Sequence, residues 1–117
     1  MPTIAFISPK GGVGKTTAAL LLASQLARGA KVSVIDADPN HPIAAWGRDA
    51  QLPENLSIVA DVDEDNILDR IEEAAAKTPF VIVDLEGTAA KIVLLAVSQA
   101  DLVVIPMQGS QLDAEQM

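Results

Sequence analysis

A glycine-rich segment near the N-terminus holds the residues best suited to chemistry. Residues 9–17 read Pro-Lys-Gly-Gly-Val-Gly-Lys-Thr-Thr and lie between a short apolar run and a helical pattern. Glycines let a backbone wrap closely around a phosphate and turn its N–H groups inward. In such a loop Lys15 reaches the β- and γ-phosphates of a nucleotide, and the Thr16 hydroxyl is a ligand of Mg²⁺. The predicted phosphate-binding loop consists of Lys10, Gly11, Gly12, Val13, Gly14, Lys15, Thr16 and Thr17.

Two positions distinguish this segment from the common phosphate-loop pattern. Pro9 stands where that pattern has glycine, while every later requirement of the pattern is met. Lys10 has no role in the pattern, because the loop backbone and Lys15 already contact the phosphates of one nucleotide. Lys10 is therefore free to project toward the nucleotide of another subunit. The plainer alternative for Lys10 is an exposed lysine that only adds positive charge. The plainer alternative for the whole segment is a glycine-rich turn between a strand and a helix.

Three aspartates stand where two predicted strands end. Asp36 closes the predicted strand 31–36, Asp38 follows it two residues later, and Asp84 closes the predicted strand 80–84. In an open parallel sheet, ligands bind beyond the carboxyl ends of the strands. The three carboxylates are therefore expected at the same edge as the phosphate-binding loop. Taken singly, an aspartate at a strand end also serves as a helix cap or a turn former.

The same residue types suit phosphoryl transfer from a nucleotide. That reaction requires a metal ion held by hydroxyl and carboxylate oxygens, and a group that orients the attacking water. Asp84 follows four apolar residues, which is the Walker-B form, and is predicted to hold Mg²⁺ directly or through water. Asp36 and Asp38 are candidates for the outer coordination of the metal and for positioning the water, and Gly87 can offer its backbone N–H to the γ-phosphate. The predicted metal-binding set is Thr16, Asp36 and Asp84.

The elements that position these residues alternate between strands and helices. Strands are predicted over residues 3–7, 31–36, 57–60, 80–84 and 101–105. Three longer helices are predicted: residues 15–28, a helix from a cap at Asp63 to a break at residues 77–79, and one from Thr88 to about Gln99. Two further helical segments are predicted near residues 44–46 and from residue 111. Parallel strands joined by crossover helices place helices on both faces of a sheet. The predicted fold class is α/β, a parallel sheet within a three-layer α/β/α architecture of the P-loop NTPase kind.

Length and composition restrict the class of protein. The chain has 117 residues, 50% of them hydrophobic, with 16 acids, 8 bases and a formal net charge of −8. This length suits a single domain, predicted over residues 1–117. The absence of cysteine excludes disulfide scaffolds, thiolate metal sites and cysteine nucleophiles. No apolar stretch approaches the roughly 20 residues of a membrane span, and no signal peptide precedes the first strand, so we expect a cytoplasmic protein that does not bind a membrane.

The negative charge is concentrated in one stretch. Residues 61–73 carry seven acids and a single base, and so hold −6 of the net charge. This stretch is predicted to be a solvated helix face. No basic patch suited to a nucleic-acid backbone is visible in the sequence. Any contact with DNA is therefore expected to come from a missing C-terminal part or from a partner.

Several segments together resemble one family of ATPases. Residues 10–17 resemble the deviant Walker-A motif of the ParA/MinD family, and residues 36–39 resemble its first switch. The segment around Asp84 resembles the Walker B and second switch of these proteins, and residues 103–106 resemble the strand before their nucleotide-base region. The resemblance runs in register over residues 3–113. Members of the family are typically longer, so the chain is expected to be an N-terminal portion, truncated at its C-terminus.

This resemblance implies an ATP- and Mg²⁺-dependent homodimer that hydrolyses ATP to ADP and phosphate. It implies that Lys10 contacts the nucleotide of the facing subunit and that Asp38 orients the hydrolytic water. Together with Lys15, these are the expected catalytic residues. The resemblance also implies a ParB-like DNA-binding adaptor protein as the partner, and a role in plasmid or chromosome partition.

Within the family, the ParA branch fits better than the MinD branch. Thr16-Thr17 and Asp38-Pro39 resemble the residues that ParA proteins have in the same motifs, and the sequence shows no membrane-binding helix. At Glu86, where ParA proteins usually have proline, the chain looks closer to the VirC1-like subgroup linked to DNA transfer. Two other functions stay open: a nucleotide-binding module without useful turnover, and a small-molecule kinase built on the same loop.

Overall fold

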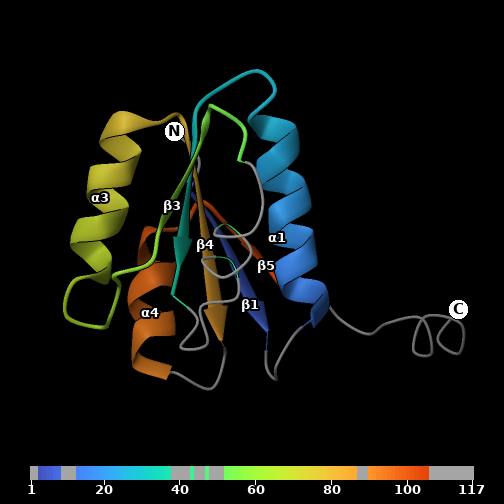
Figure 1. Cartoon of the computed structure of the whole chain (residues 1–117). Coiled ribbons are helices and arrows are strands. Elements are labelled where there is room, and N and C mark those ends of the chain that lie inside the picture. The colour runs from blue at the N-terminus through green and yellow to red at the C-terminus, as the bar shows by residue number, and fades with distance from the viewer. Residues whose placement is uncertain are drawn as a thin grey trace, which may run out of the picture.

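Among the residues that the structure describes, five parallel strands form one sheet in this computed structural model (Figure 1). The described residues are 3–8, 13–37, 43, 47, 52–86 and 90–105, of which residues 8, 13–17 and 90 are described by their backbone alone. The strands are β1 (Thr3–Ser8), β2 (Val32–Asp36), β3 (Leu56–Val59), β4 (Phe80–Glu86) and β5 (Leu102–Val104). Their order across the sheet is β3-β2-β4-β1-β5, and every pair is parallel.

Three longer helices connect the strands within the described part of the chain. They are α1 (Val13–Leu26), α3 (Ile67–Lys77) and α4 (Ala90–Gln99). α1 covers one face of the sheet, while α3 and α4 cover the other (Figure 1). The predicted three-layer α/β architecture is therefore confirmed. None of the described helices combines the length and the apolar character needed to cross a membrane.

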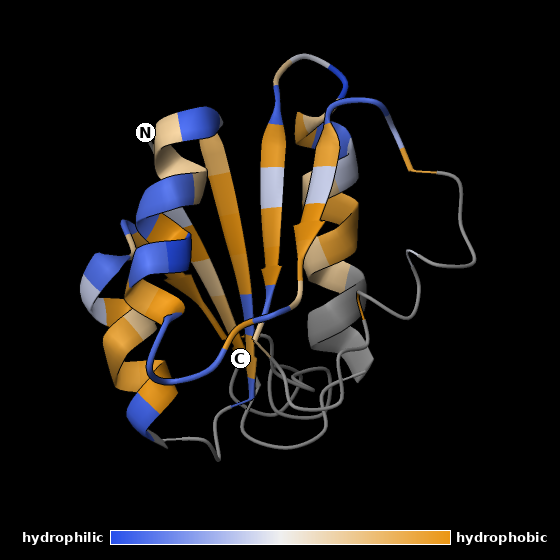
Figure 2. Ribbon diagram, turned by 60° about the vertical axis from the view of Figure 1, so that its left-hand side comes forward, coloured by the Kyte–Doolittle hydropathy of each residue, from blue (hydrophilic) through white to orange (hydrophobic). Residues whose placement is uncertain are grey.

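The central strands are buried on both faces, and their residues alternate between two cores. On the α1 face, Val32, Val34 and Ile82 pack together with residues of α1. On the opposite face, Ile35 and Val83 pack with residues of α3 and α4. This alternation follows from the two-residue period of a strand. Figure 2 shows the largely hydrophobic strands between the helices, with hydrophilic residues on the outside of α3. α1 and α4 each also expose a leucine, Leu21 and Leu94.

The contact of α1 with the sheet is made largely by small residues. α1 and the turn after it contribute three fully or almost fully buried alanines to this core: Ala19, Ala23 and Ala27. Residues four apart lie on the same face of a helix. Because alanine side chains are short, this face of α1 can lie close to the strands, and its N-terminal end is held near the end of β1.

The end of α1 differs from the prediction that the helix reaches Arg28 and stops before Gly29. The helix ends at Leu26. The N–H groups of Arg28 and Gly29 donate to the carbonyls of Gln25 and Leu26 at 3.2 and 3.1 Å, which tightens the last turn. Gly29 does not adopt the left-handed backbone, and a Cβ there would meet no atom within 4 Å. The helix therefore stops in a tight turn and not at a glycine of positive φ.

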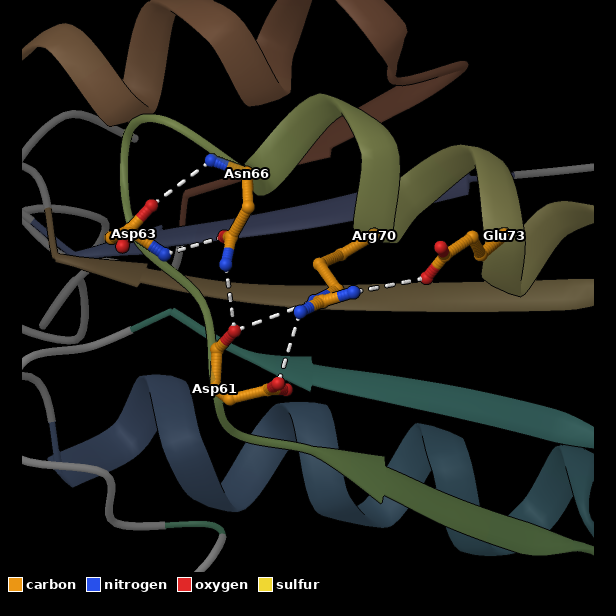
Figure 3. A network of polar contacts seen from close by, with 5 residues as sticks. All are labelled: Asp61, Asp63, Asn66, Arg70 and Glu73. Carbon is orange, nitrogen blue, oxygen red and sulfur yellow. Dashed lines mark hydrogen bonds and ion pairs between the residues drawn. The ribbon is translucent and has the colours of Figure 1, made fainter.

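Asp63 makes the hydrogen bonds of the predicted cap, although the regular helix α3 begins four residues later, at Ile67. The helix begins at Ile67, and its N-cap residue, Asn66, makes no side-chain capping hydrogen bond. Asp63 caps the turn that leads into the helix: its Oδ1 accepts the N–H groups of Asp65 and Asn66, both at 2.9 Å, and its carbonyl accepts the Ile67 N–H at 2.9 Å. The Asn66 Oδ1 in turn accepts the Asp63 N–H at 2.7 Å (Figure 3). A short aspartate side chain reaches N–H groups two and three residues onward, and here these belong to the turn.

The predicted apolar face and end of α3 are confirmed. Five residues at helical spacing pack in the core between α3 and the sheet: Ile67, Leu68, Ile71, Ala74 and Ala75. The helix ends at Lys77, and Thr78 has an extended backbone with φ −132° and ψ 146°. The residue before a proline is biased toward this conformation, and Pro79 follows. The break at residues 77–79 is thus a local property of the chain.

The strand predictions are right to within two residues at each end. β4 extends two residues beyond its predicted end, to Glu86, because it continues to pair with β1 as far as Ser8. The predicted cap at Thr88, the short helix at residues 44–46 and the helix from residue 111 lie outside the described residues.

Candidate functional site

The carboxyl ends of β1, β2 and β4 meet the start of α1 at one end of the sheet (Figure 1). β1 ends at Ser8, and α1 begins at Val13, two residues earlier than predicted. The backbone of residues 13–17 therefore forms the first turn of the helix. The first N–H groups of a helix have no carbonyl partner within it and carry the positive end of its dipole. An anion placed beyond the end of β1 would meet these N–H groups.

Two of the predicted acids lie side by side at this end of the sheet. Asp36 on β2 is in register with Asp84 on β4, and both are 0% exposed. By the alternation of the strands, both point to the same side as Val34 and Ile82, which is the side of α1. The Ala37 N–H donates to the Asp84 carbonyl at 3.0 Å and holds the chain beyond β2 against β4. The fold therefore brings these two carboxylates and the first turn of α1 to the same side and end of the sheet.

The carboxylate pair has a donor set that suits a hard divalent cation. Mg²⁺ is held by oxygen ligands, commonly one or two carboxylates together with phosphate oxygens. Like charges directly opposite each other on neighbouring strands repel, and a bound cation offsets this repulsion. No group of three or more His, Cys, Asp or Glu that could hold a metal occurs among the described residues. The carboxylate oxygens of Asp36 and Asp84 thus fit part of the donor set of a magnesium site.

The other predicted site residues are placed only in part. Helical backbone is observed for Val13, Gly14, Lys15, Thr16 and Thr17. Five predicted residues lie outside the described residues: Lys10, Gly11, Gly12, Asp38 and Gly87. Glu86, for which the sequence indicates no role, pairs with Ser8 at the end of β4 and is half-buried. The roles of all these residues stay predictions.

The acidic stretch 61–73 is a solvated surface, as predicted. All seven of its acids are exposed. Arg70 lies between two of them, with Nη2 at 3.0 Å from Asp61 Oδ2 and Nη1 at 3.3 Å from Glu73 Oε1 (Figure 3). Exposed ion pairs contribute about 0.2–1 kcal/mol each to stability. This network tethers the connection after β3 to α3, and it adds no chemical group to the site at the strand ends.

The variant Asp84→Asn is expected to lose the Mg²⁺ dependence of nucleotide binding. An amide in this position is a weaker ligand than a carboxylate and removes one of the two buried charges that a cation would neutralise. The expected loss of Mg²⁺ affinity is at least about tenfold, measured by titrating Mg²⁺ against the protein with an ATP analogue and following the melting temperature. Asp69→Asn, which removes an exposed acid from α3, is the matched control. Equal Mg²⁺ dependence in the two variants would contradict the metal role of Asp84.

Sequence comparison relates the whole chain to one family. The family model described as VirC1 protein matches residues 1–117. A protein named ParA from Rhizobium radiobacter is 44% identical to this chain over 115 residues, which cover 97% of this chain and 52% of that protein. The chain spans about half the length of the curated relatives it matches.

Solved structures share the fold of this chain. A plasmid partition protein from Borrelia burgdorferi superposes with a TM-score of 0.74 at 19% identity, covering 99% of this chain and 71% of that one. A second partition-protein structure from the same organism, described as bound to AMPPNP, superposes with a TM-score of 0.65 at 20% identity and covers 99% of this chain and 66% of that one. At these identities the structural likeness establishes the three-layer fold.

Proposed function

This chain belongs to the VirC1 family of ParA-like proteins, and from that premise we propose that it is the nucleotide-binding part of an ATP-dependent switch. In this proposal ATP and Mg²⁺ bind at the carboxyl ends of β1, β2 and β4, and the loaded form closes a homodimer. Hydrolysis of ATP to ADP and phosphate reopens the dimer. The switch acts in the cytoplasm, in the partition of plasmid or chromosome DNA or in DNA transfer.

The observation that carries the proposal is the register of Asp36 with Asp84 at the end of the sheet where α1 begins. The N–H groups of the first helical turn and the Lys15 ammonium would hold the phosphates. Thr16 and Asp84 would hold the metal, with Asp36 in its outer coordination. When bound, Mg²⁺ would neutralise the charge that develops on the phosphate oxygens. The apolar strands below keep the two carboxylates fixed in position.

The relatives support the choice of nucleotide and the partition role in this proposal. AMPPNP, an analogue of ATP, is bound in one of the solved structures of the same fold. The names ParA and plasmid partition protein, borne by similar chains, support a partition role. The proposed partner is a ParB-like DNA-binding adaptor protein. Contact with DNA would pass through this adaptor or through a C-terminal part, because the described surface carries an extended acidic stretch.

The variant Asp38→Ala is expected to keep ATP binding and to lose hydrolysis. Asp38 follows Asp36 by two residues in the sequence. It is proposed to orient the attacking water, a task that matters only to the chemical step. Loss of a positioned water typically lowers the rate by about 100-fold or more. The measurements are nucleotide affinity by calorimetry and phosphate release under saturating ATP. A parallel loss of affinity and rate would instead place Asp38 among the metal ligands.

Phosphate release also tests the proposed activity as a whole. The protein with Mg-ATP should release phosphate faster than its Lys15→Ala variant under the same conditions. Binding of ATP without any release above that control would identify a nucleotide-binding module without turnover. Formation of ADP only when a small-molecule acceptor is added would identify a kinase. Either result would replace the switch proposal.

A further inference from the structure

A polar groove opens between α3 and the edge of the sheet formed by β2 and β3. It encloses about 320 Å³. Three hydroxyl side chains line it: Ser33, Ser57 and Thr78. The Ser33 and Thr78 side chains are buried, and their hydroxyl oxygens are 2.9 Å apart. Ser33 lies at the amino end of β2, and Thr78 lies two residues before β4, so both are at the end of the sheet opposite to the carboxylate pair.

Three side chains of the groove are basic, in a chain whose net charge is −8. Lys31 and Lys77 are exposed, and in the described part of the chain no ion pair engages either ammonium group. Arg70 is held by Asp61 and Glu73, and only 30% of its side chain is exposed (Figure 3). Its guanidinium is therefore fixed at the groove wall, while the two lysines are available to a ligand. Glu73 also lines the groove, where its carboxylate is paired with Arg70. The positive charge that the groove offers to a ligand is therefore that of Lys31 and Lys77.

β3 adds a second binding element beside the groove. It forms one edge of the sheet and, among the described strands, pairs with β2 alone (Figure 1). Ser57 on this strand is exposed, Val59 is half-buried, and both line the groove. A sheet edge presents backbone N–H and C=O groups on which an extended peptide can add as a further strand. Every second side chain of such a peptide would enter the groove.

The spacing of the basic groups decides what kind of anion fits. Arg70 and Lys77 are seven residues apart on α3, which is two turns and about 10 Å along the helix axis. This is a separation of backbone positions along the groove, and an extended peptide can follow it. An extended chain rises about 3.3 Å per residue and turns alternate side chains to the same face. We propose that the groove binds an acidic peptide segment of a partner protein, laid along β3 with acidic side chains at alternate positions.

The charges around the groove favour a short acidic segment over a longer polyanion. Of the exposed acids of residues 61–73, Glu73 lines the groove, where it is paired with Arg70, and the others lie on α3 and in the stretch before it. A nucleic-acid duplex that reached the lysines would bring its phosphates against these acids, and like charges at close range oppose binding. A peptide of a few residues is confined to the groove. Val59 and Ala74 also give its aliphatic carbons an apolar contact.

The test is a titration of the nucleotide-free protein with a capped peptide of alternating glutamate and threonine, at constant ionic strength. Amide NMR shifts are expected to change in residues 31–33, 56–59 and 70–78. The double variant Lys31→Gln/Lys77→Gln should bind this peptide about five- to tenfold more weakly, the effect of losing two exposed ion pairs. Ser57→Glu should weaken binding too, because it places a carboxylate in the groove. The matched control is Lys91→Gln, which removes an exposed lysine on α4, outside the groove.

Several results would overturn the acidic-peptide site. The first is equal affinity of the parent and the double lysine variant for the glutamate–threonine peptide. The second is a set of amide shift changes that lie outside the groove. The third is binding of a lysine–threonine peptide as strong as that of the glutamate–threonine peptide. Stronger binding of a DNA duplex through the same two lysines would replace the peptide with nucleic acid. The titration is repeated on Lys15→Ala, where peptide binding should persist. A failure of the nucleotide proposal therefore leaves the result for the groove unaffected.

Discussion

Replacing Lys15 with alanine is expected to abolish measurable binding of Mg-ATP. Lys15 occupies the first turn of α1, beside the end of β1, and is the proposed cation for the β- and γ-phosphates. Without it, the loop offers the triphosphate only backbone dipoles. Truncating one member of a largely desolvated charge pair costs about 2–5 kcal/mol, which corresponds to roughly 30- to 5,000-fold weaker binding.

The measurement for Lys15→Ala is calorimetry with a non-hydrolysable ATP analogue and Mg²⁺. Alanine favours helix at least as well as lysine, so the first turn of α1 should persist in the variant. Lys91→Ala is the matched control, since the Lys91 side chain is 68% exposed on α4 and its ammonium lies 3.8 Å from a Glu64 carboxylate oxygen. Unchanged affinity in Lys15→Ala would refute the phosphate-binding loop. An equal loss in both variants would point to general electrostatics instead of a specific contact.

Replacing Lys10 with alanine is expected to leave the affinity of the monomer for ATP nearly unchanged and to abolish ATP-induced dimerisation. The motivating feature is the extra lysine in a loop whose contacts to its own nucleotide are already supplied by the backbone and Lys15. A lysine that contacts the triphosphate of the facing subunit is partly desolvated when the dimer closes. Its truncation would cost about 2–5 kcal/mol, enough to remove a dimer at micromolar concentration.

Sedimentation with the non-hydrolysable analogue separates the two roles of Lys10. Wild type and Lys10→Ala are compared at equal concentration, and nucleotide affinity is measured on the same samples. Weaker ATP binding by the monomeric variant would show that Lys10 serves its own subunit. A variant that still dimerises with ATP would rule out the contact with the facing subunit. Because the relatives are about twice as long, the same pair of measurements on a full-length relative controls for interface contributed by their additional length.

Local patterns in the sequence were sufficient to predict the elements and the chemistry of one end of the sheet. Apolar runs such as residues 81–83 are buried on both faces, which is why they read as continuous hydrophobic strands. The proline after Thr78 ends α3 by a steric effect between neighbouring residues. A phosphate-binding loop is likewise continuous in sequence, so its residue types are recognisable without any tertiary information.

Features that depend on small differences between local contacts were predicted less well. Asp63 makes the hydrogen bonds of a cap as predicted, yet a turn separates it from the regular helix, which begins at Ile67. Gly29 has the residue type of a helix stop, yet the helix ends earlier in a tight turn. Both patterns specify that a turn is near, and competition between nearby N–H and C=O groups decides its position within a few residues.

Only the tertiary structure decided which distant residues meet. The placement of β4 between β2 and β1 sets Asp36 opposite Asp84, and the groove joins Lys31, Arg70 and Lys77 from two elements that the sequence separates. Strand order and register come from packing between elements far apart in the chain, a free energy that no local window of sequence contains. The residue types at the proposed nucleotide site were therefore readable from the sequence. The carboxylate pair and the groove, in contrast, form only because β4 lies between β2 and β1 and β3 lies beside β2.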